Sequence, residues 1–106
     1  MKYIQTLLSD TLNNEQREII LVGEQREQVK SSLYLQIEDS SGLTLLVKGK
    51  LSQAANPTVL ATVDMAEFAK KSAINSNGIY MLLSEELYSV VLEVTGSAMI
   101  TVKSVE

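Results

Sequence analysis

The feature of this sequence that most constrains its fold is a regular alternation of apolar and polar residues between short turn signals. Residues 74–105 show it most clearly, with an Asn-Gly turn, an apolar segment, a short acidic break, a long alternating segment, a Thr-Gly-Ser turn and a last alternating segment. A period of two places successive side chains on opposite faces of an extended chain, which predicts strands with one buried face. The pattern therefore indicates an all-β domain.

The same alternation and turn spacing predict further strands upstream. Residues 30–38 and 43–51 are expected to form a hairpin, because the intervening Asp39-Ser40-Ser41-Gly42 has the residue types of a tight turn. Gly49 falls on the inward face of the second strand, which predicts a bulge or a close contact there. The expected strands, seven to eight in number, are residues 3–8, 18–22, 30–38, 43–51, 58–65, 79–84, 87–95 and 98–105. Their alternation predicts inward faces that include Leu33, Leu35, Ile37, Leu45, Val47, Val59, Ala61, Val63, Val90, Leu92, Ile100 and Val102.

One short helix is predicted near residues 66–71. Asp64 stands three residues before Glu67, which resembles a helix cap with its acidic third residue. Met65, Phe68 and Ala69 follow helical i, i+3, i+4 spacing and would place apolar side chains on one face of that helix. Such a helix would close one end of the sheets.

These elements together predict the architecture. No connection is long enough to hold the crossover helix that parallel strands require. We therefore expect an antiparallel β-sandwich of the jelly-roll or immunoglobulin-like type, with seven to eight strands and the one short helix near residues 66–71. At 106 residues, the chain is expected to be a single β-sandwich domain over residues 1–106.

Composition removes most kinds of active site. The chain has no histidine and no cysteine, which eliminates the commonest metal ligands and the Ser-His and Cys-His nucleophile pairs. The 9 basic and 13 acidic residues give a net charge of −4 without a basic stripe, so nucleic acid is not an expected partner. No apolar run has the length of a signal peptide or a membrane span, and we therefore expect cytoplasmic synthesis and no membrane partner.

The remaining polar motifs favour structural interpretations. Glu85 and Glu86 are adjacent and are expected to be solvated in a turn, not arranged as the carboxylate pair of a glycosidase. No loop offers enough oxygen ligands for calcium. Tyr3, Tyr34 and Tyr80 are candidates for stacking on a sugar, although a lone outward tyrosine is usually a cross-strand packing residue. We expect no catalytic, cofactor-binding or metal-binding residue, and no small-molecule substrate.

Several predicted strands carry apolar residues on both faces, which is more than one core requires. Exposed apolar surface commonly marks protein–protein contact. The outward-facing Leu46, Leu60, Val91 and Met99 are therefore the candidate assembly interface. The alternative is that a loop or helix covers the outer face of the sheet.

Two short patterns carry a resemblance to a known group of proteins. They are Ile74-x-x-Asn77-Gly78-Ile79-Tyr80 followed by Val94-Thr95, a Gly-Ser turn and Ile100-Thr101-Val102-x-x-Val105, and, upstream, Leu35-Gln36-Ile37-Glu38 followed by Val47-Lys48-Gly49. Over about residues 30–105, the chain resembles small bacteriophage virion structural proteins with a β-sandwich fold, such as head decorations, head fibres and tail components.

The resemblance implies a non-enzymatic structural role in the virion and supplies no functional residues. It implies a protein made in the host cytoplasm and assembled into the virion, with copies of itself and other virion proteins as partners. The alternative function is a stand-alone β-sandwich module that binds a carbohydrate or a host protein.

Overall fold

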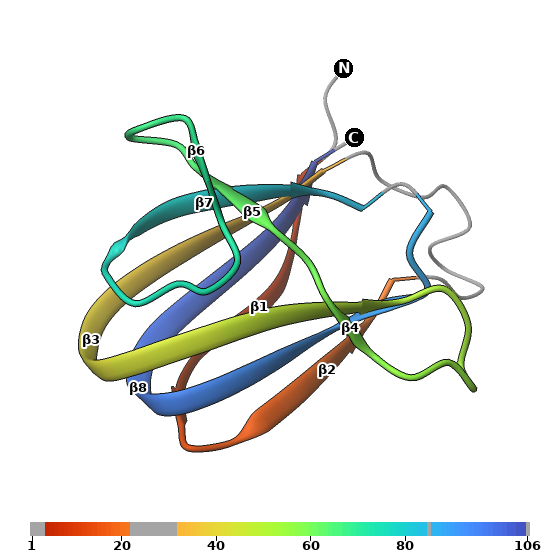
Figure 1. The fold of residues 1–106 in the computed structure, drawn as a ribbon, viewed down its shortest axis with the longest axis horizontal. Coiled ribbons are helices and arrows are strands. Elements are labelled where there is room, and N and C mark those ends of the chain that lie inside the picture. The colour runs from red at the N-terminus through yellow and green to blue at the C-terminus, as the bar shows by residue number, and fades with distance from the viewer. Residues whose placement is uncertain (1–3, 22–31, 85, 106) are drawn as a thin grey trace.

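The computed structural model describes residues 4–21, 32–84 and 86–105, and within these ranges it contains eight strands and no helix (Figure 1). All pairings are antiparallel and join the strands into one sheet, ordered β1-β8-β3-β7-β5-β6, with β2 also beside β8 and β4 beside β3. The strands are β1 (Ile4–Asn13), β2 (Gln16–Ile20), β3 (Ser32–Lys50), β4 (Thr58–Val59), β5 (Thr62–Asp64), β6 (Ala69–Lys71), β7 (Gly78–Leu83) and β8 (Ser89–Val105). The prediction of an antiparallel all-β fold is confirmed.

Strands β3 and β8 are long and bent, and they pair with each other from Ser32↔Val105 to Lys50↔Ser89. The predicted hairpin between residues 30–38 and 43–51 is therefore wrong, because these segments are the two halves of β3 and each pairs with β8. The turn residues bend the strand without reversing it. Positive φ values of 53° at Asp39 and 58° at Gly42 coincide with the register shifts that absorb the bend.

Strand β8 bends at Gly96, where φ is 83°, so the predicted Thr-Gly-Ser turn also proves to be a bend inside one strand. On the other side of β8, the chain passes from β1 to β2 at Asn14. The Asn14 backbone N–H donates to the Gly96 carbonyl at 2.9 Å, and the Gly96 N–H donates to Asn14 Oδ1 at 2.8 Å. These bonds hold the β1–β2 connection against the bend of β8.

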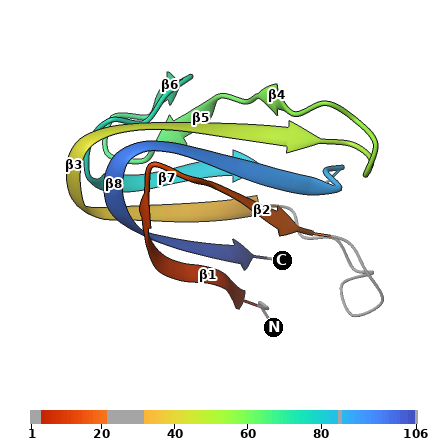
Figure 2. The same cartoon turned by 90° about the horizontal axis from the view of Figure 1, so that it is seen from below.

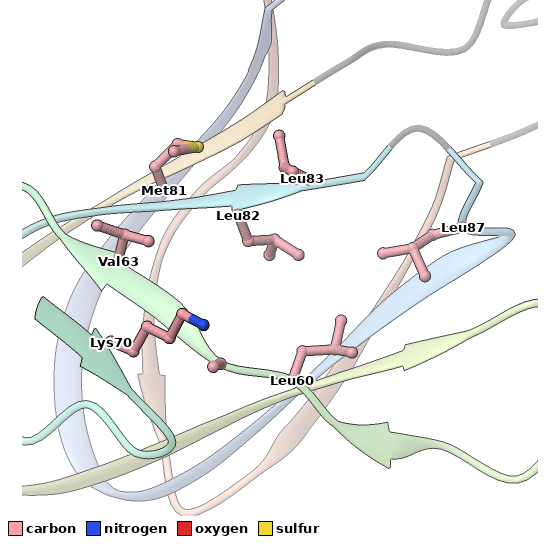
Figure 3. Close-up of a pocket in the computed structure, with 8 residues that line it drawn as sticks. Leu60, Val63, Lys70, Met81, Leu82, Leu83 and Leu87 are labelled. Carbon is pink, nitrogen blue, oxygen red and sulfur yellow. The ribbon is translucent and has the colours of Figure 1, made fainter.

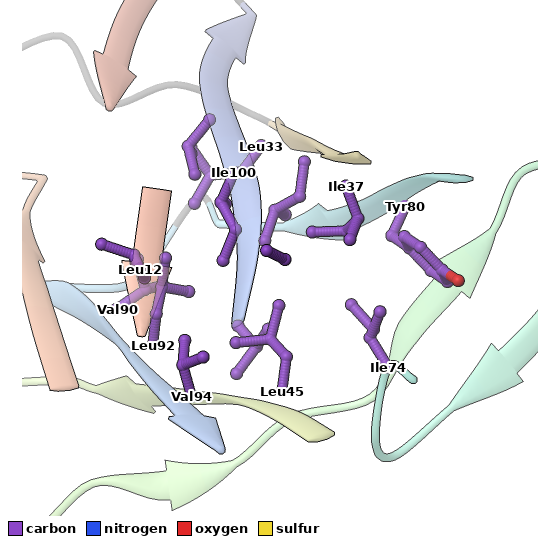
Figure 4. Close-up of a cluster of buried hydrophobic side chains, with 14 of the residues drawn as sticks. Leu12, Leu33, Ile37, Leu45, Ile74, Tyr80, Val90, Leu92, Val94 and Ile100 are labelled. Atoms are coloured by element: carbon purple, nitrogen blue, oxygen red, sulfur yellow. The ribbon is translucent and has the colours of Figure 1, made fainter. Parts of the chain in front are cut away.

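The bends fold the single sheet over, so that its two halves face each other, as Figure 2 shows for β3 and β8. One half contains β1, β7 and the 97–105 part of β8, and the other contains β2, β4 and the 89–95 part. One core cluster lies between them (Figure 4), and its members include Leu33, Leu35, Ile37, Leu45, Val47, Val90, Leu92, Ile100 and Val102. The inward faces predicted for these residues are confirmed.

The segment 58–65 departs from the prediction of one continuous strand. It divides into β4, which pairs with β3, and β5, which pairs with β7, so the chain crosses from one half of the sheet to the other near Leu60. Thr62 is buried and Val59 is exposed, the reverse of the predicted faces. Since a strand that changes partners has no reason to keep one inward face, the alternation in sequence did not describe this segment.

The predicted helix near residues 66–71 is wrong, and a tight turn between β5 and β6 takes its place. Asp64 does act as a local cap, because its Oδ1 accepts a hydrogen bond from the Ala66 N–H at 2.9 Å. The Phe68 N–H then donates to the Asp64 carbonyl at 2.7 Å, and Phe68 adopts a φ of +56°. A positive φ ends helical propagation, and residues 69–71 return as β6 beside β5.

Candidate functional site: an apolar hollow beside strand β7

Of the polar candidates from the sequence, the structure describes Glu86, Tyr34 and Tyr80, and Glu86 is exposed in a turn. No group of three or more Asp, Glu, His or Cys side chains in the described part of the chain is placed to hold a metal ion, and no helix there is long and apolar enough to cross a membrane. Glu85 and Tyr3 lie outside the described residues. Tyr80 is buried, and its hydroxyl donates to the Ser76 carbonyl at 3.0 Å, so it offers no surface for a sugar. Tyr34 does lie on an outer face, in register with Met81 and Lys103.

An ion-pair network covers the outer face of β2, β3 and β8 around Val91. Val91 lies in register between Glu18 and Lys48 and is 7% exposed. Lys48 Nζ lies 2.9 Å from Glu93 Oε2, and Lys50 Nζ lies 3.3 Å from Glu18 Oε2. Long lysine stems that reach across a strand cover apolar surface while their charged ends stay in water. Val91 is therefore not available as a contact residue in this face.

Glu18 is also tied to the buried Ser89, whose hydroxyl donates to Glu18 Oε2 at 2.6 Å. This hydrogen bond, with the neighbouring Lys50 ammonium, holds the pKa of the Glu18 carboxyl below its ordinary value of 4.5, against the opposing effect of desolvation. The network thus favours the charged form of Glu18.

The structure does not bring the four predicted interface residues into one patch. Leu46 and Val91 are diagonal neighbours on the outer face of one half of the sheet, where Leu46 is half-buried opposite Glu93. Met99 lies on the outer face of the other half, and the Thr11 hydroxyl contacts its sulfur at 3.7 Å. Leu60 lies apart from both, on the segment that crosses between the halves.

Leu60 lines an apolar hollow of about 380 Å³ beside the end of β7 (Figure 3). Leu60, Leu82 and Leu87 point toward one another across it. The hollow is lined by Leu60, Val63, Met81, Leu82, Leu83 and Leu87, together with Ala61 and the side chain of Lys70.

The hollow exists because β5 is shorter than its neighbour. In the described residues β5 pairs with β7 at Val63↔Met81 and Asp64↔Tyr80, while β7 continues to Leu83. Past Val63 toward the N-terminus the chain leaves the edge of β7, and the Leu60 N–H donates to the Val47 carbonyl at 2.8 Å in the other half of the sheet. Strand β3 pairs with β7 as far as Ser32↔Leu83, so it is only on the opposite edge that the end of β7 has no strand beside it within the described residues.

A second hollow of about 360 Å³ adjoins the first, because Leu60 and Leu87 line both. Its floor includes Gly49, where an added Cβ would lie 2.7 Å from Leu60 Cδ1 and 3.1 Å from Leu87 Cδ2. The predicted close contact at Gly49 is therefore confirmed. The missing side chain at this position is what allows the two leucines to approach β3.

The lining can hold an apolar side chain, since volumes of this size fall at the lower end of the range for binding pockets. Leu83 at its rim is 73% exposed, and the neighbouring Ile79 on the same face of β7 is 46% exposed. Strand β7 carries apolar residues on both faces, but Ile79 and Leu83 are not among the four predicted interface residues. Apolar residues at every second position (79, 81 and 83) are the signal in the sequence that would have identified this outer face of β7.

No protein-family model and no curated protein sequence matches the chain. Among solved structures, the SPBc2 prophage-derived protein YomS matches with a TM-score of 0.69 and 18% identity, over 100% of this chain and 94% of YomS. The PBSX exported protein XepA matches with a TM-score of 0.70 and 11% identity, over 100% of this chain and 38% of XepA. This chain therefore shares its fold with two phage-derived proteins.

Proposed function

We propose that this chain is a non-enzymatic structural protein of a phage virion, such as a capsid decoration, a head fibre or a tail component. The observation that carries the proposal is the full-length likeness to the prophage-derived YomS. We interpret the folded-over sheet as a single-sheet form of the predicted β-sandwich. The protein acts through contacts with copies of itself and with other virion proteins, and the proposal includes no cofactor, nucleic acid or membrane.

The exposed apolar surface of β7 supports a role in protein–protein contact. Ile79 and Leu83 are exposed on one face, and the hollow beside them is lined mainly by leucine, valine and methionine. Surfaces of this kind mark protein interaction sites. A stand-alone binding module is the alternative, and the hollow favours a host protein over a carbohydrate, since sugar sites stack on exposed aromatic rings.

The test is to look for the protein in assembled particles. Particles are purified by density gradient from cells that carry the gene, and their proteins are identified and counted by mass spectrometry. The proposal expects this chain in a constant ratio to the major capsid or tail protein, and a changed particle in cells that lack the gene. A chain found in the soluble fraction and absent from purified particles would contradict it.

A further inference from the structure

The turn between β5 and β6 presents the chain's single phenylalanine to solvent. Phe68 is 80% exposed, and no other large apolar side chain in the described residues is more exposed. The turn stands out from the body of the sheet (Figures 1 and 2). A side chain placed in this way makes almost no contribution to the core.

The backbone at Phe68 makes this placement more informative. Its φ of +56° lies in the left-handed region, which bulky side chains rarely adopt and which glycine or asparagine would occupy more easily. The turn is nonetheless well held, by the Phe68 N–H to Asp64 carbonyl bond of 2.7 Å and by the Lys71–Glu67 ion pair at 3.5 Å. Fold stability does not account for a phenylalanine here, and such an outlier points to a function.

The apolar hollow beside β7 is the complementary feature. Phe68 is not among the described residues that line it, so this phenylalanine does not occupy the hollow of its own chain. Glu67 precedes the phenylalanine and Lys70 stands at the wall of the hollow, so in the contact the exposed Glu67 would lie near Lys70 of the second copy in addition to its own partner Lys71. Buried aromatic anchors that enter apolar pockets, with charged groups at the rim, are the usual centres of protein interfaces.

We propose that Phe68 of one copy of this chain inserts into the apolar hollow of a second copy, with Glu67 of the first beside Lys70 of the second. Two copies that each insert Phe68 into the other form a closed two-fold dimer, whereas insertion in one direction only is head-to-tail and leads to a ring or a filament. This inference rests on the proposed function and names the contact by which copies assemble.

The test uses two variants that each remove one side of the contact. Phe68→Ser removes the inserted ring and keeps the hollow, and Leu83→Glu places a carboxylate at the rim of the hollow and keeps the ring. Both residues are mostly exposed, so both variants are expected to fold, which circular dichroism and urea midpoints check. Ile4→Ser is the matched control, because Ile4 is 56% exposed on β1, at the opposite end of the sheet order from the β5–β6 turn.

Size-exclusion chromatography with light scattering measures the mass over a wide range of concentration. The wild type and Ile4→Ser are expected to form the same oligomer, and each of the other variants is expected to run as a monomer of 11.6 kDa. An equal mixture of Phe68→Ser and Leu83→Glu is expected to form a dimer of twice that mass, because one intact ring meets one intact hollow.

Four results would overturn the proposal: a wild type that is monomeric at every concentration, a variant that keeps the wild-type oligomer, a control that loses it, or a mixture that stays monomeric. A wild type that is monomeric but present in purified particles would refute this contact and leave the proposed function standing. An oligomer that behaves as expected but is absent from purified particles would refute the proposed function and leave this contact standing.

Discussion

Gly96 holds the bend of β8 against the bend of β3, and replacing it with alanine tests whether this contact decides the fold. A Cβ at Gly96 would lie 2.2 Å from the Gly42 carbonyl oxygen and 2.6 Å from the Ser41 oxygen. These are backbone atoms, so they move only if the two bends separate. Gly42→Ala is the matched control, because Gly42 also has a positive φ, 58° against 83°, and a Cβ there meets nothing within 4 Å.

The two substitutions share the strain of a left-handed alanine, about 1–2 kcal/mol, which is partly offset by the lower entropy of the unfolded chain. Gly96→Ala adds the separation of two packed strands, and because the atoms met are backbone this overpacking cost lies in the upper part of the usual range, about 2–3 kcal/mol. We therefore expect Gly42→Ala to lower the free energy of unfolding by about 1 kcal/mol and Gly96→Ala by about 3–4 kcal/mol.

Urea unfolding followed by circular dichroism measures both variants, with an unchanged denaturant slope as the check that the unfolded state is the same. The additional loss of unfolding free energy in Gly96→Ala, relative to Gly42→Ala, corresponds to a thermal unfolding midpoint lower by roughly 10–20 °C for a domain of this size. A Gly96→Ala protein that does not fold at all agrees with the reasoning. Equal losses in the two variants would refute it, because they would show that the contact between the bends carries no steric constraint.

Three further substitutions test the core, the ion-pair network and the hollow. Leu45→Ala in the fully buried core is expected to lower the free energy of unfolding by about 3–5 kcal/mol in urea titrations, and a loss below about 1 kcal/mol would contradict its central place. Ser89→Ala removes the hydrogen bond that lowers the pKa of Glu18, so the variant should be less stable than the wild type above pH 4.5. This difference in the free energy of unfolding should vanish as the pH falls through the lowered pKa of Glu18, and urea midpoints that differ equally at every pH would argue against it. Gly49→Ala places a Cβ 2.7 Å from Leu60 Cδ1, so it should push the Leu60 side chain toward the hollow and lower the free energy of unfolding by about 1–3 kcal/mol. Self-association measured by light scattering should then weaken, and unchanged association would refute the displacement of Leu60.

The candidate site shows which exposed residues the sequence pattern predicts and which it does not. Exposed apolar residues are present on β7, at Ile79 and Leu83, and not at the four residues that the sequence selected, although Leu60 does line the hollow. Val91, selected by the same reasoning, is covered because lysines from β3 reach glutamates on β2 and β8. That cover depends on strands far apart in the chain lying in register, which alternation within one strand cannot reveal.

Phe68 was predicted to lie on the apolar face of a short helix and instead projects from a turn. The helix pattern near residues 66–71 was a local signal of three apolar residues and one cap. Isolated helices of this length are not stable in water, so the surroundings decide the conformation. Here the edge of β7 offers hydrogen bonds to β5, and β5 in turn pairs with β6, which makes a hairpin the better solution.

The sequence by itself determined that the chain is built of antiparallel strands and which side chains enter the core, as Leu33, Leu45, Leu92 and Ile100 show. It also marked the places where the chain changes direction. Whether Asp39–Gly42 reverses the chain or bends it was decided by the tertiary structure, because a positive φ serves both purposes. Each half of β3 has an apolar face that needs a partner, and β8 provides one along the whole length, so the strands run on through the bend and the sheet folds over its own core.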